Sequence, residues 1–165
     1  MKELRVLIES LAPAGEEQLS AWFTLPIDAD VFEERLKVTM DSENYRIIET
    51  ELPFADEVKE DTIAGQLNNL YTLFTELPSN LQEDCEELLC FYTSLEELHK
   101  YRNEIIHYPL CKNMTDVART VLEQSPAYNA LSESILRYFD FEGYGQYLDD
   151  NGKFVETDHG IYELP

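Results

Sequence analysis

Apolar residues recur at spacings of three, four and seven positions between residues 60 and 99, where acidic residues separate them. The two series are Ile63, Leu67, Leu70, Tyr71, Phe74 and Leu77, then Leu81, Cys85, Leu88, Leu89 and Tyr92. Such spacing places apolar side chains on one face, so it predicts three short amphipathic helices. Leu77-Pro78 predicts a break between the first two helices, and Ser79-x-x-Gln82 and Ser94-x-x-Glu97 each fit a capping box.

The residues before this segment alternate with a period of two, which is typical of strands. We expect strands at residues 3–9, 20–25 and 46–52, where β-branched and aromatic residues are frequent. A short helix is predicted at 28–37, with Val31, Phe32 and Leu36 facing the core. The pattern therefore predicts a small antiparallel sheet with one helix.

After residue 100 the pattern mixes both periods. It predicts a strand at 103–108, a helix at 114–124 with Val117, Val121 and Leu122 inward, and a helix at 131–140. Asp150-Asn151-Gly152-Lys153 is a turn sequence and favours a hairpin turn over a calcium loop. Strands at 154–157 and 161–164 would flank a second turn at Asp158-His159-Gly160.

These elements predict an α+β fold. Leu52-Pro53-Phe54 and the charged residues 56–61 indicate a boundary after the first sheet. We expect an elongated chain of three small lobes: an α+β lobe at 1–59, an acidic helical bundle at 60–102, and a small sheet with helices at 103–165.

Charge narrows the possible partners. The 165 residues include 34 acidic and 12 basic ones, for a net charge of -22, and residues 60–99 contain no Lys or Arg. Phosphate binding needs cations, and this chain has few, so no direct nucleic-acid ligand is predicted and a basic protein partner is favoured. DNA carries one charge per about 1.7 Å of axis, so this net charge corresponds to about 11 base pairs. Lobes arranged in a row would reduce self-repulsion.

Any one carboxylate is adequately explained by solvation or helix capping. Neither reason explains why residues 60–99 contain no Lys or Arg, because opposite charges at neighbouring helix positions would stabilise the helices. We therefore interpret the summed field as functional. The candidate partner-binding, phosphate-mimicking acids are Asp28, Asp30, Glu33, Glu34, Glu57, Glu60, Asp61, Glu76, Glu83, Asp84, Glu86, Glu87, Glu96, Glu97, Glu123, Asp149 and Asp150.

The sequence gives little support for catalysis, cofactor binding or metal binding. Nucleotide-binding and nucleophile motifs are missing, so no catalytic residue, enzyme activity or cofactor is predicted. Two Glu-x-x-His pairs, Glu96 with His99 and Glu104 with His107, are too close in sequence to face each other across a bundle, so no metal is predicted. Three cysteines without a C-x-x-C indicate reduced thiols in the cytoplasm, and no apolar run is long enough for a membrane span or signal peptide.

Several segments together resemble one known family. They are AWFTLPID at 21–28, ELPF at 51–54, TDVARTVLEQ at 115–124 and the ending at 138–164. In the order of these segments, in its length and in its acidity, the chain resembles the ArdA antirestriction proteins. The resemblance implies a non-enzymatic DNA mimic, made by mobile elements, that occupies the DNA-binding groove formed by the specificity and methyltransferase subunits of type I restriction-modification enzymes.

The resemblance also implies a three-lobed homodimer joined through the C-terminal lobe. Candidate dimerisation residues are Leu136, Tyr138, Phe139, Phe141 and Tyr144. Gly143 and Gly145 depart from the family, whose related segment is a continuous helix, and would weaken that helix by about 1 kcal/mol each. The alternative function is an acidic chaperone or shield for basic nucleic-acid-binding proteins, without imitation of duplex geometry.

Overall fold

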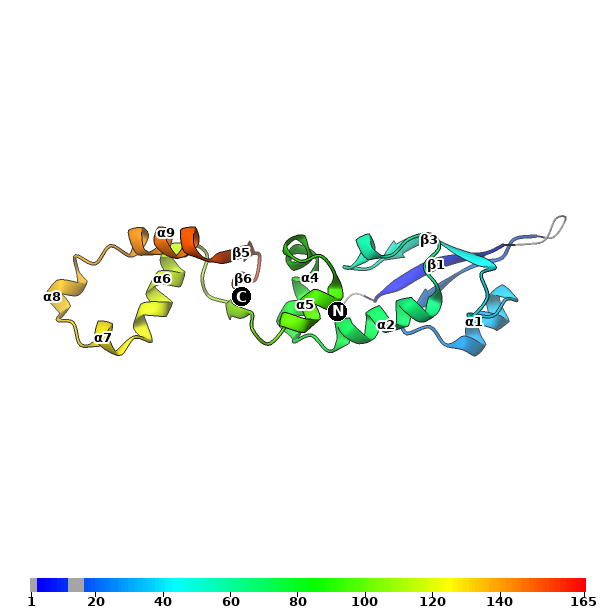
Figure 1. Cartoon of the computed structure of the whole chain (residues 1–165), viewed down its shortest axis with the longest axis horizontal. Helices are drawn as coiled ribbons and strands as arrows, with labels where there is room; N and C mark the ends of the chain where they lie inside the picture. Colours follow the sequence, from blue (N-terminus) through cyan, green and yellow to red (C-terminus); the bar gives the residue numbers. More distant parts are fainter. Residues whose placement is uncertain (1–2, 12–16) are drawn as a thin grey trace. The chain divides into compact units, whose positions relative to one another are not determined.

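The computed structural model describes residues 3–11 and 17–165, and the chain divides into two compact units, residues 1–100 and 101–165. Within those residues the fold is α+β, with two three-stranded antiparallel sheets and helices (Figure 1). This fold class confirms the prediction. The described helices include none that is long and apolar enough to cross a membrane.

Unit 1 contains the first sheet and most of the helices. Its strands are β1 (Arg5–Ser10), β2 (Ser20–Thr24) and β3 (Tyr45–Glu51), in the order β2-β1-β3. Its helices are α1 (Ala29–Leu36), η1 (Ala55–Glu57), α2 (Ala64–Thr75), α3 (Ser79–Glu83), α4 (Cys85–Leu88), η2 (Leu89–Phe91) and α5 (Leu95–Tyr101). The three predicted strands and the helix near 28–37 are confirmed, with Asp28 capping α1 by accepting from two backbone N–H groups.

The alternation in β1 buries Val6 and Ile8 on one face of the sheet, and α1 and α2 cover that face (Figure 1). The rings of Phe23 and Phe32 are 5.3 Å apart, and Phe32 meets Tyr45 edge-on at 4.8 Å. The Tyr45 hydroxyl accepts from the Ala64 N–H at 2.8 Å, so sheet and α2 share one core. Val31, predicted inward, is 37% exposed because it lies about 100° around α1 from Phe32.

A ring contact and a backbone hydrogen bond cross the predicted boundary near residue 60. The rings of Phe54 and Phe74 lie 5.9 Å apart, and the Ile47 N–H donates to the Glu60 carbonyl at 2.9 Å. The compact unit therefore extends from the sheet through α5, while the division into lobes at 59/60 stays a prediction.

The first predicted capping box, Ser79-x-x-Gln82, does not form. Ser79 is not an N-cap, because Pro78 occupies that position without a side-chain cap, and Gln82 donates to the Leu77 carbonyl at 2.8 Å instead. The second box is closer to expectation. Ser94 Oγ accepts from the Glu97 N–H, and the Glu97 carboxylate accepts from the Thr93 N–H at 2.8 Å.

Unit 2 has a second sheet and four helices among its described residues. The strands β4 (Ile106–Tyr108), β5 (Lys153–Thr157) and β6 (Gly160–Leu164) pair in the order β4-β6-β5. The helices are α6 (Met114–Glu123), α7 (Pro126–Asn129), α8 (Glu133–Leu136) and α9 (Phe141–Asn151). Gly160 turns the β5-β6 hairpin with φ of 118°, and an added Cβ would meet the Tyr108 carbonyl.

Three predictions for this unit need correction. The helix at 131–140 is only Glu133–Leu136; Leu131 and Ile135 are 37% and 54% exposed, so these two residues add little burial to support a longer helix. Asp150 and Asn151 do not form a hairpin turn; they end α9. The strand at 103–108 is limited to its last three residues, since Glu104 hydrogen-bonds in a preceding turn.

Gly143 and Gly145 lie inside α9 and have different environments. The Gly143 N–H donates to Asp140 Oδ1 at 2.9 Å, which caps the helix. Gly145 is buried, and an added Cβ would lie 2.7 Å from the Met114 carbonyl oxygen at the start of α6. Glycine therefore permits the close packing of α9 on α6, which offsets its lower helix propensity.

Replacing Gly145 with alanine should destabilise unit 2 by about 1–3 kcal/mol, because the methyl group clashes with backbone that cannot rotate away. Hydrogen exchange of the unit 2 amides measures this directly. Gly65→Ala is the matched control, since no atom lies within 4 Å and the helix should gain up to about 1 kcal/mol. Equal exchange in Gly145→Ala and the natural chain would contradict the packing argument.

The three cysteines should differ in reactivity at pH 8. Burial, with the charges of Glu57, Glu86 and Glu87, raises the pKa of the Cys85 thiol to about 12, and Cys111 is also buried, whereas Cys90 is exposed. Because the thiolate is the nucleophile, iodoacetamide should label Cys90 first and leave Cys85 unmodified in the folded chain. Peptide mass spectrometry reads the order, and early labelling of Cys85 would show that this core opens.

Candidate protein-binding surface

The structure places the seventeen predicted acids in three burial classes. Fourteen have exposed side chains: Asp28, Asp30, Glu33, Glu34, Glu60, Asp61, Glu76, Glu83, Glu86, Glu87, Glu96, Glu123, Asp149 and Asp150. Glu57 and Glu97 are half-buried. Most of the predicted set is therefore accessible to a partner.

Asp84 is the exception, with only 1% of its surface exposed. It lies three residues after Leu81 and four before Leu88, so it falls on the buried face of the α3–α4 segment. Its carboxylate does not contribute to an outward-facing acidic surface, and its inclusion among the partner-binding acids is corrected. The spacing in the sequence already contained this signal.

Some exposed acids have basic neighbours from distant segments. Arg46 on β3 pairs with Glu9 at 3.3 Å and with Glu60 at 3.2 Å, and the His99 ring contacts the Glu76 carboxylate. Residues 60–99 contain no Lys or Arg, yet the fold brings Arg46 to their first acid. Exposed pairs of this kind stabilise by about 1 kcal/mol or less, and they reduce the local field.

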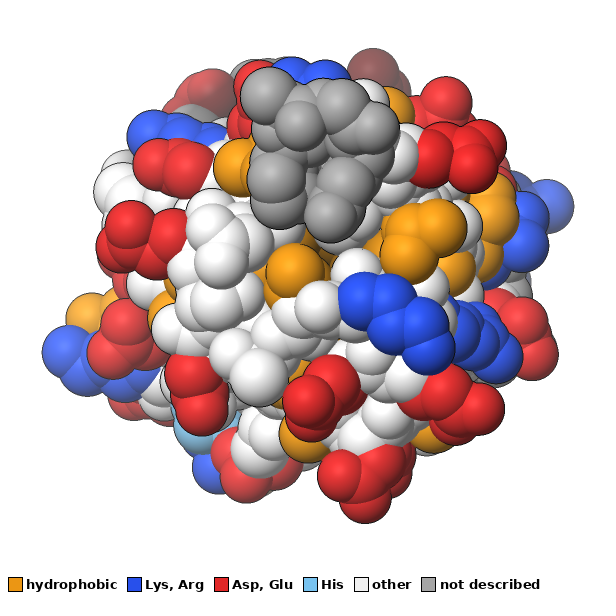
Figure 2. All heavy atoms as spheres, turned by 90° about the vertical axis from the view of Figure 1, so that its right-hand side faces the viewer, with side chains coloured by type: hydrophobic (Ala, Val, Ile, Leu, Met, Phe, Trp, Pro, Cys, Tyr) orange, Lys and Arg blue, Asp and Glu red, His pale blue; other side chains and the backbone are white. Residues whose placement is uncertain are grey.

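Many of the remaining acids lie on helices. Asp30, Glu33 and Glu34 project from α1 and line a shallow hollow with Lys37. Glu83, Glu87 and Glu96 are exposed on α3, α4 and α5. On the face of the molecule shown in Figure 2, acidic side chains are numerous, and Lys and Arg side chains lie between them.

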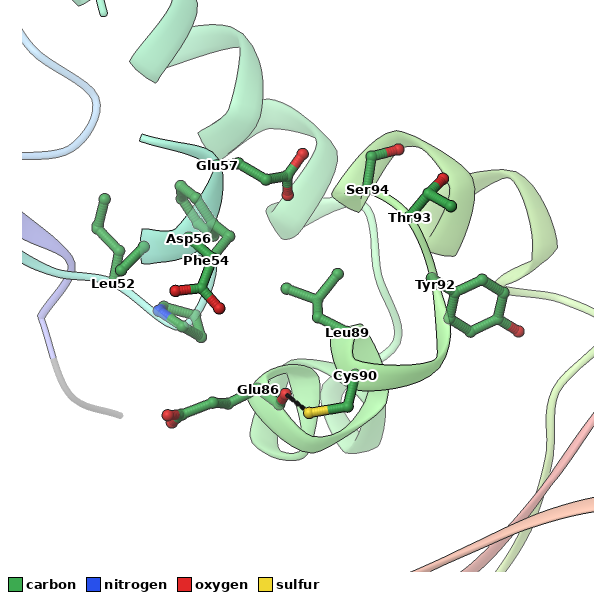
Figure 3. Close-up of a pocket in the computed structure, with 12 residues that line it drawn as sticks. Leu52, Phe54, Asp56, Glu57, Glu86, Leu89, Cys90, Tyr92, Thr93 and Ser94 are labelled. Carbon is green, nitrogen blue, oxygen red and sulfur yellow. Dashed lines mark hydrogen bonds between the residues drawn. The ribbon is translucent and has the colours of Figure 1, made fainter. Parts of the chain in front are cut away.

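A pocket of about 200 Å³ lies in unit 1 between residues 52–57 and 86–94 (Figure 3). Leu52, Phe54 and Leu89 are among its apolar lining residues, and Asp56, Glu57 and Glu86 are its acids. Leu89 projects into the middle of the group, with Glu57 on one side and Glu86 on the other. The sequence pattern does not reveal this pocket, because only the folded chain brings the residues after β3 to η2.

Glu57 connects the two sides of this pocket. Its Oε2 accepts from the Leu95 N–H at 2.8 Å, at the start of α5. Burial raises the pKa of Glu57, the hydrogen bond from Leu95 opposes this, and the charge of Glu96 adds to the increase. Glu57 thus holds η1 against α5 as well as carrying charge at the pocket.

The predicted dimerisation residues in unit 2 form part of an aromatic cluster. Phe139 is 5.0 Å from Phe141 and 6.3 Å from Tyr144, and Tyr128 meets Phe139 edge-on at 5.7 Å. Tyr138 does not share in this packing and is 89% exposed, while Leu136 is half-buried at the end of α8. Their role in dimerisation stays a prediction.

The Glu-x-x-His residues have other contacts. Glu96 and His99 both lie on α5, and the His107 ring stacks on Tyr162 with centroids 4.2 Å apart. Across residues 3–11 and 17–165, no three His, Cys, Asp or Glu side chains gather to form a possible metal site.

Replacing Glu57 with glutamine should stabilise unit 1 more at pH 7 than at pH 4. A carboxyl whose folded pKa is raised favours the protonated state, so the natural chain loses stability as pH rises through that pKa, and glutamine does not. Glutamine can still accept from Leu95. Urea unfolding followed by Trp22 fluorescence at both pH values gives the difference, with exposed Glu86→Gln as control; a larger gain at pH 4 would reverse the sign and contradict this account.

The chain was compared with known proteins and families. No curated protein matches it. The family model for the antirestriction protein ArdA matches residues 16–163, which include most of unit 1 and nearly all of unit 2. The match covers most of the length, including the acidic helices and the C-terminal sheet, and agrees with the resemblance seen in the sequence. The chain belongs to the ArdA family of antirestriction proteins.

Proposed function

We propose that this chain protects incoming DNA by occupying the DNA-binding groove of type I restriction-modification enzymes as a mimic of duplex DNA. Family membership establishes antirestriction, and the finer mechanism is inferred from charge. The observation that carries it is the set of fourteen predicted acids with exposed side chains, on a chain with net charge -22. A groove that binds phosphates is cationic and would attract such a surface.

The acids act together in this mechanism. Most of their side chains project from helices whose other faces are buried, so the backbone carries these negative charges at set separations, as a duplex carries its phosphates. No covalent step is involved, and the chain is a non-enzymatic inhibitor. It acts in the cytoplasm, on behalf of a mobile element, as a homodimer whose contact includes the aromatic cluster of unit 2.

A second candidate is a general acidic shield for basic nucleic-acid-binding proteins. On the face shown in Figure 2, Lys and Arg side chains lie between the acids, and such a mixed surface is compatible with a shield. A mimic requires acids at particular places, whereas a shield requires only their total. Two sets of variants with equal charge separate these functions.

Inhibition of a type I restriction enzyme cutting DNA should weaken as salt rises from about 50 to about 200 mM, because exposed charges are screened within about 8–10 Å. Titration of the purified chain into the cleavage reaction at several salt concentrations gives the inhibition constant. A constant indifferent to salt would exclude electrostatic mimicry.

The triple variant Glu83→Gln, Glu87→Gln, Glu96→Gln should lose about tenfold or more in inhibition, while each single change has little effect. Glu43→Gln, Glu49→Gln, Glu156→Gln is the matched control, since it removes three exposed charges outside the predicted set. A mimic loses more from the first set. Equal losses would favour the general shield, and so would tight binding to denatured basic proteins.

A further inference from the structure

The pocket between residues 52–57 and 86–94 has a composition suited to one kind of ligand. Three of its twelve lining residues are carboxylates, Asp56, Glu57 and Glu86, and none of these described lining residues is Lys, Arg or His. Anionic ligands are thus excluded. A cation entering the pocket would meet charge from η1 on one side and from α4 on the other.

The other walls favour an aliphatic stem over a hydrated ion. Leu52, Pro53, Phe54 and Leu89 supply apolar lining, and Leu89 lies in the middle of the group in Figure 3. The volume of about 200 Å³ is below the roughly 300–1,000 Å³ of sites for drug-sized ligands, so it suits a single side chain. Long basic side chains bury their methylene stems against apolar surface and keep the charged end near acids.

One of the three carboxylates, that of Glu57, is held in place without any ligand. Glu57 is half-buried, and its hydrogen bond from the Leu95 N–H fixes its carboxylate. Glu86 lies on the exposed side of the pocket, where the Cys90 thiol donates to its backbone carbonyl. A cation therefore finds a partly preorganised set of acceptors, which reduces the ordering cost of binding.

We propose that this pocket receives an arginine side chain of the basic partner, as an anchor within the binding surface. The inference rests on the proposed function for the source of the arginine. Guanidinium is more weakly hydrated than ammonium and carries five donors in a plane, so it suits an apolar pocket with carboxylates on different sides. The anchor adds a shape-dependent contact to a surface that otherwise acts through summed charge.

The first test uses the full-length chain and butylguanidinium, with binding followed by chemical shifts of backbone amides. Saturable shifts should be confined to residues 52–57 and 86–95. Guanidinium without a stem should bind at least tenfold more weakly, and butylammonium should also bind more weakly. Small, non-saturating shifts over all acidic segments would overturn the pocket, and equal binding of butylammonium would overturn the choice of arginine.

The second test fills the pocket without changing charge. Cys90→Trp places a large ring among the lining residues, and Phe91→Trp, next in the sequence but outside the lining, is the matched control. We expect Cys90→Trp to weaken both butylguanidinium binding and inhibition of the restriction enzyme by about tenfold, with Phe91→Trp unchanged. Equal inhibition by all three chains would overturn the anchor while leaving electrostatic mimicry intact.

A charge-based pair covers the case in which Cys90→Trp does not fold. Asp56→Asn with Glu86→Gln should weaken inhibition several-fold more than Glu83→Gln with Glu87→Gln, which removes two exposed charges of the predicted set outside the pocket. Equal effects would overturn the anchor. If the natural chain failed to inhibit any type I enzyme, the proposed function would fall, yet saturable butylguanidinium binding would still establish the pocket.

Discussion

Repulsion between carboxylates is the constraint on which this structure depends. With a net charge of -22, the chain has few cations for pairing, so its acids are stabilised in other ways. Asp28 and Asp140 accept from backbone N–H groups at helix starts, and Glu57 accepts from the first residue of α5. Arg46 pairs with two acids, Glu9 and Glu60. Hydrogen bonds to backbone donors thus take over much of the role that lysine and arginine have elsewhere.

Local patterns were enough to predict the strands and the main helices. Alternation in β1 and the Phe32–Leu36 spacing in α1 each reflect burial on one face, which the sequence records directly. The same reasoning missed α9, where Gly145 looks unfavourable until its contact with the Met114 backbone is known. It also predicted too long a helix at α8, because exposed apolar residues such as Ile135 have the same spacing as a core face.

The sequence predicted a set of acids for the candidate site, but it did not predict the ion pairs or the pocket of that surface. Exposure could be inferred for acids on polar faces, while the burial of Asp84 required attention to its spacing from Leu81 and Leu88. The ion pair between Arg46 and Glu60 and the pocket around Leu89 join segments far apart in sequence. Such contacts depend on tertiary packing, which local patterns in the sequence do not reveal.

The shortness of the central helices has a consequence for how this protein can vary. α3, α4 and α5 contain five, four and seven residues, too few to persist alone in water, so the interior formed by Leu81, Leu88 and Leu98 determines where they lie. Replacing one of those leucines with a smaller residue would change no ionisable side chain, but it would shift the helices that carry the acids. The positions of the exposed acids on these helices therefore depend on buried leucines as well as on the acids themselves.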